Sequence, residues 1–228
     1  MTTNSIIPER SNNAIVQKLS KEGKHTALRT ILANKENSRH ADEVDSNGFT
    51  PLMNAIIQDQ YECVRVLLEG KYCNPNARSM KEGVTPLGMV ALSPHLKYIT
   101  MISRILVSHG ALVSSLQQGD KYNLVHLATS TGNITMVQYL LSLDDTVHLV
   151  DDYCAYGYTP LHYSIMMRPF EFFHQKFSES DLLENYVNCA KALIRYGCDV
   201  KKKTRDGKRD AMSICVEFKN KFPAPVLE

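Results

Sequence analysis

The chain has 228 residues, of which 43% are apolar and 22% are charged, and its 26 basic and 24 acidic residues leave a net charge of +2. This near balance excludes a global field that would favour nucleic acid or a membrane surface. No apolar stretch reaches the roughly 18 residues that span a bilayer, and the start lacks the charge pattern of a secretory signal. Because the six cysteines lack C-x-x-C spacing, we expect reduced thiols in a cytoplasmic or nuclear protein.

The first predicted elements form an N-terminal cap. We expect residues 1–11 to be flexible and residues 12–44 to contain two short helices. Their apolar positions recur at helical spacing: Ile15, Val16 and Leu19 in the first helix, then Leu28, Ile31 and Leu32 in the second. Lysines and an arginine between these positions are typical of the solvated outer face of a capping unit.

Four longer segments follow and share one pattern, over residues 45–79, 80–117, 118–153 and 154–203. Each has an anchor residue that opens a first apolar helix, here called helix A, and a second helix, helix B, that ends in paired apolar residues. The anchors are Thr50, Thr85, Asn123 and Thr159. Thr accepts a hydrogen bond from the helix it precedes, and the Pro that follows three of the anchors suits a first helical turn. The spacing predicts that helix B of the first repeat covers residues 61–69.

These segments resemble the ankyrin-repeat family, whose repeat has about 33 residues and a T-P-L-H-x-A signature. The resemblance covers residues 12–220 and implies an all-α solenoid of helix-turn-helix units with β-hairpin loops, folded as a single domain. Gly48, Gly83 and Gly157 stand two residues before an anchor, where the tight turn requires positive φ. A helix pair of this kind buries its apolar face only against its neighbours, so the repeats share one core.

The chain is predicted to end in a second cap over residues 204–220 and a tail over residues 221–228. This cap keeps Asp206 and Gly207 but has Arg209 and Asp210 where the repeats have Thr-Pro.

The last full repeat carries an insertion. Thr159 and Gly197 are 38 positions apart, about 17 more than the family pattern. Asp181 and Glu184 match a capping box that would open a long helix B, which leaves residues 168–180 as the insertion. Phenylalanines recur within it at helical spacing, and they either fold onto helix B or form an aromatic ridge for a partner.

We find no pattern for catalysis, for a metal or for a cofactor. The histidines and cysteines lack metal-ligand spacing, and no Walker loop, nucleophile elbow or dinucleotide fingerprint occurs. His126 and His162 occupy the T-P-L-H position, where the resemblance implies hydrogen bonds within and between repeats.

The resemblance also implies that a protein partner binds the hairpin tips and the exposed side of helix A, on the concave face. Large apolar or amphipathic residues at such positions indicate an interaction surface. The candidate partner-binding residues are Phe49, Ile57, Glu82, Leu92, Asp120, Tyr122, Tyr156, Tyr158, Met166, Met167, Phe170 and Phe173. In the alternative interpretation, the lengthened repeats bury Leu92, Met166 and Met167 as local core.

Residues 201–209 form a basic tract that contains Lys201, Lys202, Lys203, Arg205, Lys208 and Arg209. It is either a solvated hairpin or a contact for nucleic acid or an acidic partner. We therefore predict a non-catalytic module or adaptor that binds a protein segment on its concave face. The alternatives are a nuclear or chromatin-associated factor that uses the basic tract, and a module that delivers an effector or enzyme domain outside this chain.

Overall fold

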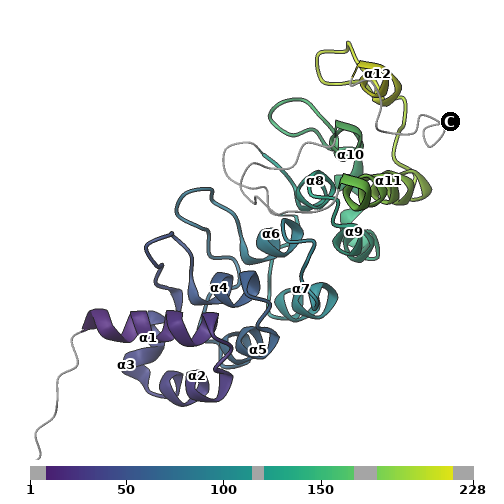
Figure 1. Ribbon diagram of the computed structural model, residues 1–228. Helices are drawn as coiled ribbons and strands as arrows, with labels where there is room; N and C mark the ends of the chain where they lie inside the picture. Colours follow the sequence, from purple (N-terminus) through teal and green to yellow (C-terminus); the bar gives the residue numbers. More distant parts are fainter. Residues whose placement is uncertain (1–8, 115–120, 167–178, 218–228) are drawn as a thin grey trace, which may run out of the picture. The chain divides into compact units, whose positions relative to one another are not determined.

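The computed structural model describes residues 9–114, 121–166 and 179–217, and among them it contains helices and no β-strand (Figure 1). The all-α prediction is confirmed. The hairpin loops between repeats contain no assigned strand in these ranges, but they keep hairpin-like hydrogen bonds, such as the 2.9 Å bond from the Asp45 N–H to the Phe49 carbonyl. The predicted insertion lies outside the described residues up to residue 178, as does the predicted tail over residues 221–228.

The chain divides into two compact units. Unit 1 comprises Met1–Met89 and Met101–Ala111, and unit 2 comprises Val90–Thr100 and Leu112–Glu228. The single domain over residues 12–220 stays a prediction.

Unit 1 begins with the N-terminal cap and continues with helix pairs. The helices that lie wholly within it are α1 (Glu9–Lys21), α2 (His25–Leu32), α3 (Lys35–Ser38), η1 (Arg39–Asp42), α4 (Pro51–Ile57) and α5 (Tyr61–Glu69). Two helices are divided between the units: α6 (Pro86–Ala91) begins in unit 1 and ends in unit 2, and most of α7 (Ile99–Ser108) belongs to unit 1. Helix α1 packs on α4 and α2 packs on α5, so the cap covers the first full repeat. Buried side chains at this junction include Val16, Leu28 and Leu67.

The predicted bounds of helix B in the first repeat are confirmed, because α5 runs from Tyr61 to Glu69. The cap differs from the prediction in one respect. Helix α1 begins at Glu9, so three of the eleven residues expected to be flexible are helical.

Unit 2 contains α8 (Leu124–Ser130), α9 (Ile134–Leu141), η2 (Asp144–Asp151), α10 (Pro160–Met166), α11 (Glu179–Arg195) and α12 (Ala211–Glu217). Helix α10 packs on α8, α11 and α12, and α11 packs also on α9. Buried apolar side chains such as Leu124, Leu140 and Leu193 fill the space between these helices.

The predicted long helix B of the last full repeat is α11, but the capping box is wrong. The helix already begins at Glu179, so Asp181 lies inside its first turn instead of before it.

Three of the anchor residues, Thr50, Thr85 and Asn123, cap their helices as predicted. The hydroxyl oxygen of Thr50 accepts from the Met53 N–H at 3.3 Å. In the third repeat Asn123 replaces Thr, and its side-chain oxygen accepts from the His126 N–H at 3.0 Å. The anchor position therefore needs an acceptor oxygen and tolerates either residue.

The turn glycines adopt the predicted conformation, with φ of +84° at Gly48, +63° at Gly83 and +80° at Gly157. In the third repeat Lys121 takes this place with φ of +53°. A side chain in this left-handed region is unfavourable, so the turn before α8 is held by its surroundings and not by local preference.

Candidate partner-binding surface

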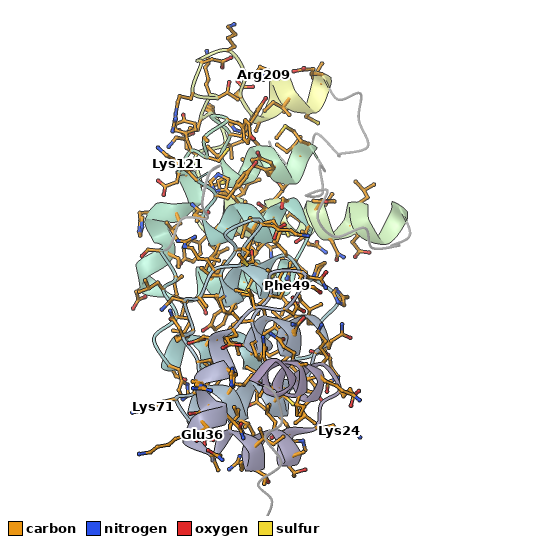
Figure 2. The ribbon with its side chains drawn as sticks, turned by 90° about the vertical axis from the view of Figure 1, so that its left-hand side faces the viewer. Lys24, Glu36, Phe49, Lys71, Lys121 and Arg209 are labelled. Carbon is orange, nitrogen blue, oxygen red and sulfur yellow. The ribbon has the colours of Figure 1, made fainter. Side chains whose placement is uncertain are left out.

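The residue just before each anchor has an equivalent position on its hairpin loop. In unit 1 these pre-anchor residues are Phe49 and Val84, and in unit 2 they are Tyr122 and Tyr158, to which the structure adds Arg209. Phe49 and Tyr158 are half-buried. Figure 2 labels Phe49, and it shows Arg209 on the loop that precedes α12.

Arg209 is a pre-anchor residue because the predicted alignment of the C-terminal cap is wrong by one position. The Ser213 N–H donates to the Asp210 carboxylate at 2.8 Å, so Asp210 is the helix cap and Arg209 precedes it. The loop accommodates Lys208 as one additional residue while its Thr204 N–H still donates to the Arg209 carbonyl at 2.6 Å.

Tyr122 was expected on the exposed face, and the structure corrects this expectation. Only 6% of Tyr122 is exposed. Its hydroxyl is 2.8 Å from the Tyr163 hydroxyl, and its ring lies 6.2 Å from the Tyr156 ring, centre to centre. Two aromatic residues of the next repeat therefore cover it and make it part of the core of unit 2.

Leu92 and Met166 were also expected to be exposed and are only 2% and 8% exposed. The α8–α9 turn buries the end of α6, since the Asn133 side-chain amide donates to the Val90 carbonyl at 2.9 Å. Met166 ends α10, which packs between α8, α11 and α12. For these two residues, the alternative interpretation as local core is the correct one.

The remaining candidates differ in exposure. Tyr156, at a hairpin tip, is 61% exposed, while Ile57 and Glu82 are partly buried. Asp120, Met167, Phe170 and Phe173 lie outside the described residues. Met80 was not among the predicted contacts, although it is 73% exposed. An apolar residue within the hairpin loop, three positions before Gly83, was the signal that could have identified it.

Beneath Phe49, unit 1 has a polar network. Asp45 accepts from the Lys21 ammonium at 2.8 Å and from the Asn54 amide at 3.0 Å. Burial alone would raise the pKa of Asp45, but these bonds and two backbone N–H groups outweigh it and lower the pKa. The carboxylate therefore stays charged and fixes the first hairpin loop to α1 and α4.

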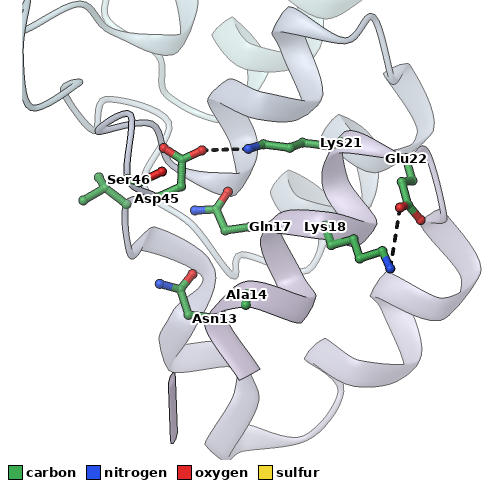
Figure 3. A pocket seen from close by; sticks show the side chains of 9 residues that line it. Asn13, Ala14, Gln17, Lys18, Lys21, Glu22, Asp45 and Ser46 are labelled. Atoms are coloured by element: carbon green, nitrogen blue, oxygen red, sulfur yellow. Dashed lines mark hydrogen bonds and ion pairs between the residues drawn. The ribbon is translucent and has the colours of Figure 1, made fainter. Parts of the chain in front are cut away.

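A hollow of about 490 Å³ opens beside this network, between α1 and residues 44–46 (Figure 3). Its walls include Gln17, Lys18 and Ser46. The side-chain oxygen of Asn13, which also lines the hollow, is buried without a hydrogen-bond partner among the described residues. Because this oxygen has almost no exposed surface, it is not an acceptor that a group entering the hollow could reach.

The corresponding position in unit 2 is aromatic. Tyr163 stands where Asn54 stands in unit 1, and Cys154 stands where Asp45 does. The Tyr163 hydroxyl is 3.7 Å from the Cys154 sulfur. Burial is the main cause that raises the pKa of Tyr163, and its hydrogen bond to Tyr122 adds to it. The hydroxyl stays neutral, and it has a structural role.

His126 and His162 have the predicted structural role. Nε2 of His126 lies 3.0 Å from the Tyr158 carbonyl, and Nε2 of His162 lies 3.1 Å from the Lys202 carbonyl. Each ring therefore links helix A to the hairpin loop of the next repeat. Burial lowers the pKa of both histidines to about 4, so both are neutral at pH 7.

The basic tract forms the hairpin loop before α12, and tyrosines from the preceding loop lie under its cations. Lys202 Nζ is 4.9 Å and the Arg205 guanidinium is 5.5 Å from the Tyr153 ring centre. Arg209 lies 5.5 Å from the Tyr158 ring centre and donates to its hydroxyl at 2.6 Å. These contacts join residues about 50 positions apart, and no sequence pattern indicated them.

The chemical groups that would indicate catalysis or metal binding do not gather in the described part of the chain. No group of three potential metal ligands occurs within these ranges. None of the six cysteines, all of which lie in the described ranges, forms a disulfide there. None of the helices in the described ranges is long and apolar enough to cross a membrane.

Comparison with known proteins defines the class. A family model described as ankyrin repeats (3 copies) matches residues 10–111 and 97–175. Since these matches cover more than half of the sequence, the chain belongs to the ankyrin-repeat family. Members of this family are generally protein–protein interaction modules. A search among curated proteins gives no significant match.

Solved structures share the fold at low sequence identity. One is a chain in the structure of the predatory endopeptidase Bd0816 from Bdellovibrio bacteriovorus in complex with the immunity protein Bd3460. This chain has a TM-score of 0.68 and 20% identity, and the alignment covers 93% of the present protein and 95% of that chain. The ankyrin repeat protein EF0377 has a TM-score of 0.65, 20% identity and coverage of 89% and 90%. An ankyrin repeat domain from Acinetobacter baumannii AYE has a TM-score of 0.70, 19% identity and coverage of 93% and 93%.

Proposed function

We propose that the chain is a non-catalytic interaction module that binds a segment of another protein on its hairpin loops. The observation that carries this proposal is the pair Tyr156 and Tyr158 on one loop of unit 2. Tyr156 is 61% exposed and Tyr158 is half-buried. Tyrosine provides a large contact area and loses little conformational entropy on binding, which suits it as an anchor.

The loops of unit 1 support the same role with different chemistry. Met80 is 73% exposed and its backbone N–H donates to the Gly48 carbonyl at 3.0 Å. A flexible thioether on a fixed backbone adapts to an irregular partner surface.

The nuclear or chromatin-associated alternative has weaker support. Single-stranded nucleic acid is held by phosphate contacts and by bases that stack on open aromatic faces. Here Lys202 and Arg205 lie over the Tyr153 ring and Arg209 lies over the Tyr158 ring. Cations therefore already lie on these rings, which leaves base stacking without support, and charge alone does not favour phosphate over carboxylate.

The test is partner capture with a matched control. Wild type and the Tyr156→Ala/Tyr158→Ala variant are used as baits in affinity purification with mass spectrometry, beside Tyr196→Ala. Tyr196 is also partly exposed, at 38%, but lies at the end of α11 and not on a hairpin loop. We expect the double variant to lose a partner that wild type and the control retain. Equal recovery by all three baits would refute the proposal.

Tyr122 is unsuitable for this test. Because it is buried and bonded to Tyr163, its replacement by alanine would leave a cavity and destabilise unit 2. A loss of binding by a Tyr122 variant would therefore not separate contact from folding.

A further inference from the structure

The loop from Asp199 to Asp210 carries six basic and three acidic side chains. The acidic ones are held by nearby backbone groups. Asp199 accepts from the Lys201 N–H at 2.9 Å, Asp206 from the Lys208 N–H at 3.1 Å, and Asp210 from the Ser213 N–H at 2.8 Å. These carboxylates therefore stabilise the turns. Nearby cations also help to lower their pKa values, Lys208 and Arg209 that of Asp206 and Lys203 that of Asp210, but among the described residues only Arg209 of the six cations forms an ion pair.

The exposed lysines of this loop are Lys201, Lys203 and Lys208. None of the three forms an ion pair with another described residue. Arg209 does so, with the Glu217 carboxylate at 3.1 Å. This pair shows that the surface accepts a carboxylate beside a tyrosine ring.

Tyrosines fix the loop in place. The Tyr153 hydroxyl donates to the Lys203 carbonyl at 2.7 Å, and the Tyr153 ring lies under two cations of the loop. The Arg205 N–H donates to the Gly157 carbonyl at 2.9 Å, which joins the two hairpin loops directly. A loop that is ordered before binding loses less entropy when a partner docks.

We propose that residues 153–158 and 201–209, here called the cation–tyrosine face, bind an acidic segment of a partner protein. Carboxylates of that segment lie against Lys201, Lys203 and Lys208, and one of its apolar side chains covers Tyr156. This inference rests on the proposed function and specifies the chemistry of its partner. Charge complementarity supports it, because the loop has six cations against three carboxylates, and those carboxylates already accept hydrogen bonds from backbone N–H groups.

The test uses a defined probe, a fluorescein-labelled peptide of about 12 residues that contains Asp and Glu throughout and one central Phe. Its controls are the same peptide with Asn and Gln in place of the acids, and a single-stranded oligonucleotide of equal charge. Fluorescence anisotropy measures the binding of each probe to the full chain. We expect the acidic peptide to bind about tenfold more tightly than either control, and to weaken as salt rises.

The variants separate a specific face from a general charge effect. Lys201→Glu/Lys203→Glu/Lys208→Glu should weaken the acidic peptide by about tenfold or more. The matched variant Lys24→Glu/Lys81→Glu/Lys191→Glu changes the net charge equally at other exposed positions, and it should stay within about threefold of wild type. Circular dichroism and thermal melting verify that both variants are folded.

Three outcomes would overturn the inference: no binding of the acidic peptide by wild type, equal losses in the two lysine variants, or tighter binding of the oligonucleotide. The partner recovered by affinity purification distinguishes a failure of this inference from a failure of the proposed function. If it needs Tyr156 but binds the Lys201/Lys203/Lys208 variant as tightly as wild type, the acidic chemistry is wrong and the proposed function stands. If it is insensitive to the tyrosines as well, the proposed function fails.

Discussion

Replacement of Gly157 by alanine tests whether the last two hairpin loops are stacked as described. Gly157 has φ of +80°, and a Cβ there would lie 2.8 Å from the Arg205 Cβ. Gly197 has φ of +92°, and a Cβ at that position would meet no atom within 4 Å. Both alanines face the same left-handed strain, about 1 kcal/mol. Only Gly157→Ala adds a steric clash, about 1–3 kcal/mol.

Urea unfolding followed by circular dichroism measures the free energy of unfolding of wild type, Gly157→Ala and Gly197→Ala. We expect Gly157→Ala to lose about 2–4 kcal/mol and Gly197→Ala about 1 kcal/mol. The difference between the two variants isolates the contact between the loops. Equal losses would show that the Arg205 loop does not lie against Gly157, and the cation–tyrosine face would then be wrong.

Two further predictions concern the turn before α8 and the buried histidines. Lys121→Gly should raise the free energy of unfolding by about 1 kcal/mol in the same urea assay, because Lys121 has a strained backbone with φ of +53°. A lower free energy of unfolding in this variant would show that the backbone at Lys121 is not strained. His126 and His162 have pKa values lowered to about 4 from an ordinary 6.5, so the unfolded chain takes up protons first as the pH falls. The contribution of the two neutral histidines to the free energy of unfolding is therefore complete above pH 6.5 and is lost as the pH falls from 6.5 to 4. Between pH 7.5 and pH 5.5 the free energy of unfolding should decrease by about 2–3 kcal/mol. Urea unfolding at both pH values measures this loss, and ring NMR signals of the two histidines that titrate near pH 6.5 would refute it.

The parts of the fold that depend on local sequence were predictable. The anchor at Thr50, the turn at Gly48 and the bounds of helix B from Tyr61 to Glu69 each follow from residues within one repeat. Repetition of this pattern then identifies the family, because each copy provides independent evidence for the same unit.

The exposure of the site residues was harder to predict, since it depends on the neighbouring repeat. Tyr122 occupies the same position as Phe49, but it is buried because Tyr163, 41 positions away, bonds to its hydroxyl. Lys202 and Arg205 reach a tyrosine about 50 positions away through loop stacking. The predicted alignment of the C-terminal cap is wrong by one residue. A loop can accommodate one inserted residue, whereas an insertion within a helix would move the following side chains to another face.

The central claim is that the hairpin loops of unit 2 bind a protein partner through tyrosine anchors. Its most direct test is the affinity of a captured partner for wild type, Tyr156→Ala/Tyr158→Ala and Tyr196→Ala, measured by isothermal titration calorimetry. We expect the double variant to lose about 1–3 kcal/mol of binding free energy or more, and the control to match wild type. Equal affinity of all three proteins, with the double variant shown to be folded, would contradict the claim.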